Sequence, residues 1–143
     1  MKIAIACDHA GFELKENLTR DLQNRGYVVK DYGTNSEESV DYPDFAHPLA
    51  SAVEKGEFNF GITICGSGNG INMAANKHQG IRSALCWNAE IAALARQHND
   101  ANICSIPARF VSKSEAGKII EVFLNTDFEG GRHQKRIEKI PIN

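Results

Sequence analysis

The chain of 143 residues has the length of one domain, and a domain of this size buries roughly 68% of its extended-chain surface. Hydrophobic residues make up 42% and charged residues 24%, with a net charge of -2 at pH 7. This composition is typical of an ordinary globular protein, and it lacks the basic excess of a nucleic-acid-binding protein. We therefore expect a single domain over residues 1–143 and no nucleic-acid partner.

The first apolar stretch, Ile3–Cys7, is too short for a secretory signal or a membrane span. The four cysteines each lie in or beside an apolar run and show no Cys-x-x-Cys spacing: Cys7, Cys65, Cys86 and Cys104. Free buried thiols of this kind are typical of a reducing compartment. We expect a cytoplasmic protein without a membrane partner, a zinc site or a disulfide framework.

Strand-like and helix-like segments alternate along the chain. Apolar, β-rich runs predict five strands: Lys2–Cys7, Tyr27–Tyr32, Phe58–Cys65, Ile81–Trp87 and Asn102–Ile106. Apolar spacing, terminal glycines and a Ser112/Glu115 capping box predict the helices: Phe12–Arg25, Phe45–Lys55, Ile71–Lys77, Ala89–His98 and a helix from Ser112 through Leu124. A polar loop, Gly33–Pro43, is longer than usual. A basic, helical tail begins at about residue 131 and covers Arg132–Lys139.

This alternation, with strands of continuous apolar character, predicts an α/β fold with a doubly wound parallel sheet covered on both faces. In such sheets ligands bind beyond the carboxyl ends of the strands. Asp8-His9, Cys65-Gly66 and the region after Ile106 all fall at that edge. We expect these three segments to converge.

The segment Gly61–Gly70, GITICGSGNG, ends a buried strand in a cysteine that faces a glycine-rich turn. Alternate glycines leave backbone N–H groups free to converge on an anion beside the Cys65 sulfur. A free thiol has a pKa of about 8.5, and lowering it to about 7, as a helix N-terminus can, raises the thiolate fraction about tenfold. A cysteine at a strand end is commonly a small core residue. The adjoining glycines are the feature that favours a catalytic role for Cys65.

Two other glycine-loop chemistries are disfavoured. A dinucleotide-binding fingerprint would need its third glycine at Ile71, and it normally follows the first strand. A cysteine-dependent phosphatase would need an arginine six positions after its cysteine. The chain has Ile71 at that distance from Cys65 and Glu13 at that distance from Cys7.

Other candidate residues are polar groups near the ends of predicted elements. His98 ends a helix just before a strand and returns toward the sheet edge, and an imidazole with a pKa of about 6.5 can shuttle a proton. Asp8 and His9 follow the first strand as either a helix cap or a substrate contact. Arg132 and Arg136 share one helix face and suit a phosphate group, although such a run is commonly a solvated charged face.

Seven motifs occur in order along the chain: Cys7–Gly11, Asp41–Pro43, Ile64–Ile71, Ala74–Lys77, Gly80–Arg82, Arg96–Asp100 and Gly130–His133. Together they closely resemble the type B ribose-5-phosphate isomerase family, which also holds galactose-6-phosphate and allose-6-phosphate isomerases. The resemblance implies a single-domain, three-layer, Rossmann-like fold with a five-stranded parallel sheet. It further implies a homodimer or a tetramer of such dimers, with the active site between two subunits.

The activity implied by the resemblance is interconversion of D-ribose 5-phosphate and D-ribulose 5-phosphate in the pentose phosphate pathway, without metal or organic cofactor. Cys65 matches the family's base, His98 the residue that opens the sugar ring, and Asp8 a group that moves protons between substrate oxygens. Ser67 stands where many members have threonine and keeps the hydroxyl of that catalytic position. The matching substrate-binding positions are Asp8, His9, Tyr42, Gly66, Ser67, Gly68, Asn69, Gly70, Asn99, Arg109, Arg132 and Arg136.

Two alternatives stay open at this point. A six-carbon aldose phosphate, allose 6-phosphate or galactose 6-phosphate, requires the same chemistry, because the sequence does not give the depth of the pocket. A non-catalytic, flavodoxin-like phosphate-binding domain is the alternative from another class. A receiver domain would need an aspartate after the third strand and a lysine after the fifth, where this chain has Cys65 and Pro107.

Overall fold

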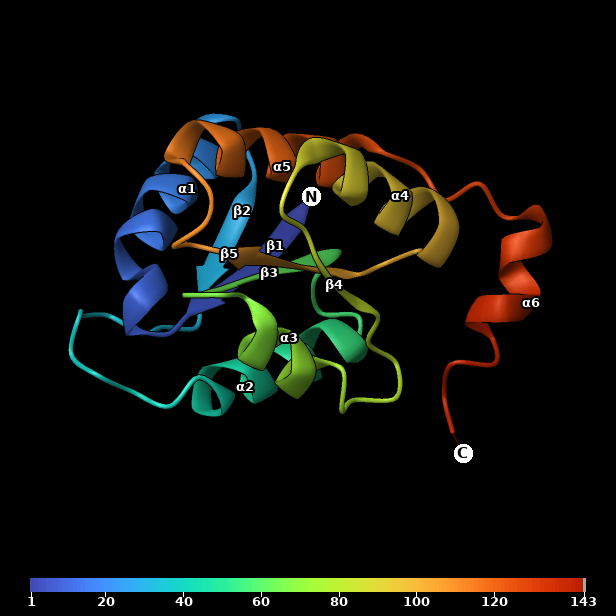
Figure 1. Ribbon diagram of the computed structural model, residues 1–143, viewed down its shortest axis with the longest axis horizontal. Helices are drawn as coiled ribbons and strands as arrows, with labels where there is room; N and C mark the ends of the chain where they lie inside the picture. Colours follow the sequence, from blue (N-terminus) through green and yellow to red (C-terminus); the bar gives the residue numbers. More distant parts are fainter. Residues whose placement is uncertain (143) are drawn as a thin grey trace.

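The computed structural model describes residues 1–142, in which five parallel strands form one sheet between two layers of helices (Figure 1). The strands are β1 (Lys2–Cys7), β2 (Val28–Asp31), β3 (Phe60–Cys65), β4 (Ser83–Leu85) and β5 (Ile103–Pro107). The helices are α1 (Phe12–Asn24), α2 (Pro43–Glu54), α3 (Asn69–Ala75), α4 (Ala89–Asn99), α5 (Lys113–Asn125) and α6 (Gln134–Ile137). The predicted α/β fold with a five-stranded parallel sheet is confirmed.

The two faces of the sheet differ in side-chain size. On β1, Ile3 and Ile5 join the core beneath α1, α4 and α5, whereas Ala4 and Ala6 face α2 and α3 (Figure 1). This alternation follows from the two-residue period of a strand. A Cβ atom added to Gly61 on β3 would lie 2.7 Å from the Leu49 side chain of α2. Small residues therefore let α2 approach the sheet closely.

The sheet order β2-β1-β3-β5-β4 places a topological switch between β1 and β3. The chain leaves β1 for β2 on one side, and it later enters β3 on the other side. The loops that follow β1 and β3 consequently diverge, and this opens a crevice at the carboxyl ends of the two strands. The residues directly after Cys7 and Cys65 lie at this crevice.

Several element ends differ from the sequence prediction. Helix α2 begins at Pro43 rather than Phe45, because proline is tolerated in the first turn of a helix. Strand β4 covers only Ser83–Leu85, and it is an edge strand that pairs with β5 alone. In the basic tail, a short 3₁₀ turn over Gly131–His133 precedes α6. No helix within residues 1–142 is both long and apolar enough to cross a membrane.

Candidate active site

A cleft of about 500 Å³ opens at the carboxyl ends of β1, β3 and β5. It brings together side chains from the loops after all three strands and from the long loop before α2. The lining residues are Asp8, His9, Ala10, Tyr42, Cys65, Gly66, Ser67, Gly70, Arg109 and Phe110. The three segments that the sequence places at this edge therefore do converge, as a parallel sheet requires.

Cys65 is the last residue of β3 and is 4% exposed at the floor of the cleft. Its carbonyl accepts a hydrogen bond of 2.9 Å from the Ala108 N–H, and the Gly66 carbonyl accepts one of 3.0 Å from the Arg109 N–H. These bonds fasten the loop after β5 to the loop after β3. A Cβ atom at Gly66 would lie 3.1 Å from the Arg109 guanidinium. Glycine at this position lets the guanidinium lie directly over the backbone beside the thiol.

The glycine loop continues from Cys65 into α3. Gly68 adopts φ +77°, a left-handed conformation that favours glycine, and it precedes the first residue of the helix. A Cβ atom at Gly70 would lie 2.5 Å from the ring of Tyr42, so the absent side chain makes room for the tyrosine. The Ser67 hydroxyl accepts hydrogen bonds of 3.3 Å from the backbone and side-chain amides of Asn69. All of the loop residues named in the sequence prediction thus lie at or beside the cleft.

Asp8 and His9 are fixed by local hydrogen bonds. Asp8 is 7% exposed, and its Oδ1 accepts a hydrogen bond of 3.0 Å from the Ala10 N–H, which caps a 3₁₀ turn. The His9 Nδ1 accepts a hydrogen bond of 3.2 Å from the Val40 N–H and ties the long loop to the sheet edge. Because Nδ1 is an acceptor here, the proton of a neutral His9 ring is on Nε2. The helix-cap interpretation of Asp8 is correct, and both side chains also line the cleft.

Four predicted site residues lie elsewhere in the chain: His98, Asn99, Arg132 and Arg136. Helix α4 runs back from the carboxyl ends of the strands toward their amino ends, since it connects β4 to the parallel strand β5. His98 therefore lies at the amino ends of the strands, which is the end of the sheet opposite Cys65. The basic tail, with α6, lies beside this opposite end (Figure 1). Asn99 lines a different cleft together with Arg82 and Ile140.

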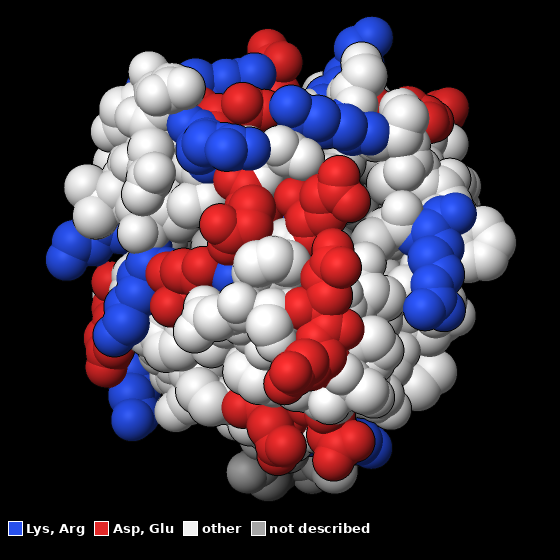
Figure 2. Space-filling model, turned by 90° about the vertical axis from the view of Figure 1, so that its left-hand side faces the viewer, with Lys and Arg blue, Asp and Glu red and all other residues white. Residues whose placement is uncertain are grey.

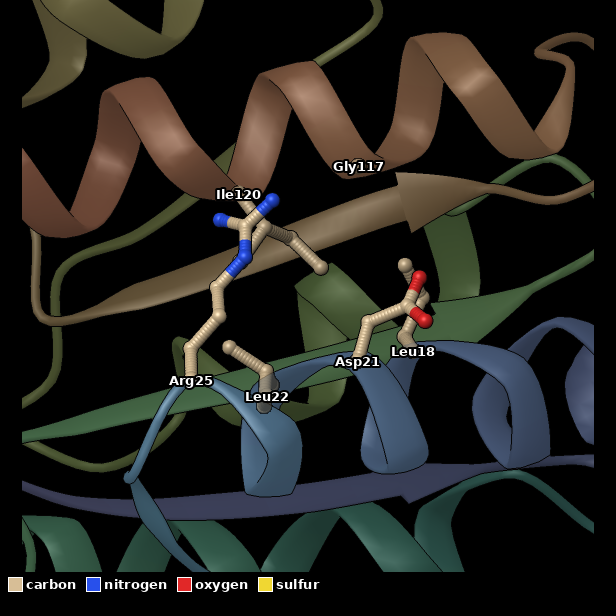
Figure 3. A pocket seen from close by; sticks show the side chains of 6 residues that line it. All are labelled: Leu18, Asp21, Leu22, Arg25, Gly117 and Ile120. Atoms are coloured by element: carbon tan, nitrogen blue, oxygen red, sulfur yellow. The ribbon is translucent and has the colours of Figure 1, made fainter.

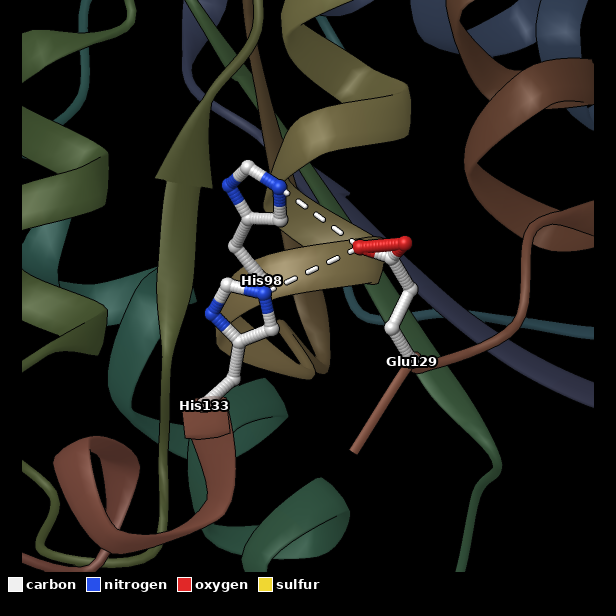
Figure 4. Close-up of side chains that lie close together, drawn as sticks. All are labelled: His98, Glu129 and His133. Carbon is white, nitrogen blue, oxygen red and sulfur yellow. Dashed lines mark ion pairs between the residues drawn. The ribbon is translucent and has the colours of Figure 1, made fainter. Parts of the chain in front are cut away.

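His98 is part of a compact cluster with two residues that sequence reasoning did not assign to it (Figure 4). Its Nε2 lies 3.6 Å from the Glu129 Oε1, and the His133 Nε2 lies 3.8 Å from the same oxygen. The two imidazole rings stack with centroids 4.4 Å apart. Desolvation lowers the pKa of His133, and the positive charges of His98 and Arg132 lower it further, while Glu129 opposes them. The i,i+4 spacing of Glu129 and His133 was the available sequence signal.

The end of the sheet that carries the Cys65 cleft is not basic. Figure 2 shows this end of the molecule, where Asp and Glu side chains gather across the middle of the face and Lys and Arg lie mostly toward its margins. A dianionic phosphate is repelled by such a field. Within the cleft Arg109 supplies a guanidinium. The remaining predicted arginines, Arg132 and Arg136, lie in the basic tail, at the opposite end of the molecule from the cleft (Figure 1).

A second, much smaller cavity lies between α1 and α5 (Figure 3). Its volume is about 20 Å³, which is enough for one water molecule and too small for a sugar. It is lined by Leu18, Asp21, Leu22, Arg25, Gly117 and Ile120. This cavity is a packing defect between two helices and has no part in the candidate site.

The chain matches the model of the Ribose/Galactose Isomerase family over residues 3–140. It is 48% identical over 139 residues to ribose-5-phosphate isomerase B from Escherichia coli, an alignment that covers 97% of this chain and 93% of that protein. A ribose 5-phosphate isomerase structure from Thermotoga maritima superposes with a TM-score of 0.96 at 51% identity, and 98% of this chain and 97% of that chain are covered.

A third relative carries a ligand. The structure of ribose-5-phosphate isomerase B from Mycoplasma genitalium holds bound ribulose-5-phosphate, and it is 47% identical with a TM-score of 0.94. The alignment covers 97% of this chain and 93% of that chain. These matches extend over nearly the whole length of both partners and include the glycine loop, the long loop and the basic tail. The chain belongs to the ribose/galactose isomerase family.

Proposed function

We propose that this protein interconverts D-ribose 5-phosphate and D-ribulose 5-phosphate through an enediolate, with Cys65 as the base. The observation that carries the proposal is the position of the Cys65 thiol, at the end of β3 in a 500 Å³ cleft beside a glycine-rich loop. An aldose isomerase needs a base at carbon 2, donors for the developing oxyanion and a grip on the remote phosphate. Cys65 is the candidate base, the loop from Gly66 to Gly70 supplies backbone donors, and Arg109 supplies a guanidinium for the phosphate.

In this mechanism the Cys65 thiolate takes the proton from carbon 2 and returns it to carbon 1. Asp8 moves a proton between the two substrate oxygens, and the backbone N–H groups of Gly66–Gly70, with the Ser67 hydroxyl beside them, hold the enediolate. A positioned base contributes about 10²–10⁴ in rate, and one oxyanion donor contributes about 2.7–4 kcal/mol. Several donors together therefore stabilise the transition state more than the base does. No cofactor takes part in this scheme.

We further propose that a homodimer, or a tetramer of such dimers, completes each site. His98 for ring opening, Asn99 for substrate contact, and Arg132 and Arg136 for the phosphate would come from the neighbouring subunit, whereas Tyr42, His9 and Arg109 come from the same chain. Two observations support this assignment. The four residues lie at the end of the strands opposite Cys65, and Asp and Glu side chains gather across the middle of the face that carries the cleft (Figure 2). Exposed Met73, on α3, and exposed Trp87, two residues after the end of β4, supply apolar surface for such an interface.

A cytoplasmic location is part of the proposal and is supported by four free, buried cysteines. The six-carbon substrates differ from ribose 5-phosphate by one carbon. Relatives that are 48% and 51% identical to this chain are named for the five-carbon reaction. Specificity constants for five-carbon and six-carbon phosphates would therefore be expected to favour ribose 5-phosphate.

The decisive experiment follows isomerisation of ribose 5-phosphate in deuterated water by proton NMR. The parent protein should exchange the carbon-bound proton as it turns over, whereas Cys65→Ala should lose at least about 100-fold in rate because the base is absent. Cys104→Ala, which removes a buried thiol on β5 outside the cleft, is the matched control and should stay active. Turnover by Cys65→Ala at the parent rate would contradict the proposal that Cys65 is the base.

A further inference from the structure

The cluster around His98 gathers three nitrogen and oxygen donors from separate segments of the chain. His98 lies in the last turn of α4, Glu129 lies in the connection after α5, and His133 ends the 3₁₀ turn before α6. One ligand atom from each residue lies within 4.8 Å of the other two. Figure 4 shows both imidazole Nε2 atoms directed at the same carboxylate oxygen of Glu129. Two imidazoles and one carboxylate are the donor set of many zinc sites that keep an open fourth position.

The donor separations are close to those that a metal ion requires. Zinc bonds of 2.0–2.1 Å in tetrahedral geometry place neighbouring donors about 3.3–3.4 Å apart. The two Nε2–Oε1 separations are 3.6 and 3.8 Å, so contraction by a few tenths of an ångström suffices. The stacked rings must also tilt for both lone pairs to meet one ion. The side chains of His98 and Glu129 are 40% and 51% exposed and have room to do so, while His133, at 10%, is the fixed ligand.

Hydrogen bonds hold Glu129 beside the end of α4, where His98 lies, without help from the ion. The Glu129 N–H donates a hydrogen bond of 3.1 Å to the Gln97 carbonyl at the end of α4. The buried Arg96, one residue before Gln97, donates through Nε to the Thr126 carbonyl at 3.1 Å. The connection after α5 is thus fastened to the end of α4 at two points. The donors are brought together by the fold, so little ordering would be needed on binding.

A second group of two histidines and one glutamate, His47, His78 and Glu54, has a geometry that is unsuitable for binding one metal ion. The His47 Nδ1 lies 2.9 Å from the His78 Nε2, and the His78 Nδ1 lies 3.5 Å from the Glu54 carboxylate. His78 uses one ring nitrogen for each neighbour, so the three groups form a chain and do not face a common point. The same residue types therefore do not make a metal site by composition alone.

We propose that His98, Glu129 and His133 form a binding site for one divalent transition-metal ion of the zinc class, with water in the fourth position. Coordination occupies the Nε2 of His98. If His98 opens the sugar ring, as the proposed function holds, the bound ion blocks that step and acts as an inhibitor. Binding itself does not depend on the proposed function, and only the inhibition does.

The test is calorimetric titration of Zn²⁺ into the metal-free full-length protein, with Co²⁺ absorption as a second readout of tetrahedral coordination. The parent should bind one ion per chain. Glu129→Gln and His133→Gln should each weaken binding at least about tenfold, since even changes beyond the ligands cost 10–100-fold. His47→Gln removes a histidine from the chain-like group and should bind as the parent does. Circular dichroism checks that each variant is folded, and Glu129→Gln alters an exposed side chain.

The outcomes separate the two proposals. Equal zinc affinity in the parent, Glu129→Gln and His133→Gln, or loss of binding in His47→Gln alone, would overturn the site. Zinc that binds in the expected way without slowing the isomerisation of ribose 5-phosphate would leave the site standing and contradict the role of His98 in ring opening. Zinc that binds and inhibits, with both effects weakened in Glu129→Gln, supports the site and its consequence together.

Discussion

At the scale of single residues, the surroundings of each cysteine decide its chemistry. The four thiols are free and buried, so burial alone does not distinguish them. Burial raises the pKa of Cys7 to about 12 even though the nearby Lys15 opposes the change. A hydrogen bond with Cys86, together with burial, raises the pKa of Cys104 well above its ordinary value. Cys65, in contrast, lines the cleft.

This difference predicts the pattern of alkylation. At pH 8 a thiol with a pKa of about 12 is ionised in about one molecule in ten thousand, so native Cys7 should resist iodoacetamide. Cys65 should be labelled first because reagent can enter the cleft, and ribose 5-phosphate should slow its labelling. Mass spectrometry of the tryptic peptides reports both sites, and the unfolded chain is the control in which both react. Labelling of native Cys7 as fast as Cys65 would contradict this view.

At the scale of single elements, helix ends are where local sequence and structure agree best. The predicted capping box is present at the start of α5, where the Ser112 hydroxyl and the Glu115 carboxylate each accept a hydrogen bond from the other's backbone N–H. Gly26 adopts φ +91° after α1, as expected of a glycine that ends a helix. These signals involve residues only a few positions apart, so no distant contact is needed to satisfy them.

The capping box makes the stability of α5 depend on pH. Hydrogen bonds from the backbone and side chain of Ser112 lower the pKa of Glu115 below its ordinary value of 4.5. The ionised carboxylate therefore contributes stability above the unfolded pKa, and this contribution is lost as the pH falls through the lower folded pKa. Glu115→Gln keeps a capping acceptor but does not titrate. Between about pH 5 and about pH 3 its urea midpoint should fall less than that of the parent; parallel pH curves would contradict this.

Replacing Gly117 by alanine should stabilise the folded protein. It lies within α5 beside the small cavity of Figure 3, and a Cβ atom there meets no heavy atom within 4 Å. Gly117→Ala should raise the free energy of unfolding by about 1 kcal/mol, because glycine is a poor helix former. Gly56→Ala is the matched control: its Cβ also meets open space, but φ is +78°. It should destabilise by about 1–2 kcal/mol, and chemical denaturation of both variants checks the contrast.

At the scale of the whole molecule, the residues of the proposed site are divided between the two ends of the parallel strands. Cys65 and its cleft lie where the parallel strands end, and His98 lies where they begin. The helix between β4 and β5 has to cross the sheet to keep the strands parallel, and this crossing separates the two groups. One chain by itself therefore cannot bring its own His98 to its own Cys65.

A shared site predicts complementation between inactive variants. Cys65→Ala and His98→Ala should each be nearly inactive, but a mixed dimer contains one site with both residues intact. Mixing equal amounts after subunit exchange should restore about a quarter of the parent activity, because about half of the dimers are mixed and half of their sites are intact. Mixing Cys65→Ala with Cys65→Gly is the control and should restore none. Absence of any recovery, with exchange shown by native mass spectrometry, would rule out a shared site.

The sequence by itself determined the class of fold, the order of strands and helices, the cysteine beside the glycine loop and the family. Each of these depends on hydrophobic period, on turn and cap residues a few positions apart, or on motifs in fixed order. Element ends were less well determined: Ile81–Trp87 forms only a three-residue edge strand, since a strand with one partner has fewer hydrogen bonds to extend it.

Only the tertiary structure decided which candidates share a site. It placed Tyr42 against Gly70 and Arg109 over Gly66, and it set His98 beside Glu129 and His133 at the opposite end of the strands. These neighbours are tens of residues apart, and their meeting depends on the strand order and on the direction in which each helix crosses the sheet. No local pattern encodes the strand order, because it follows from packing the complete set of elements against one another.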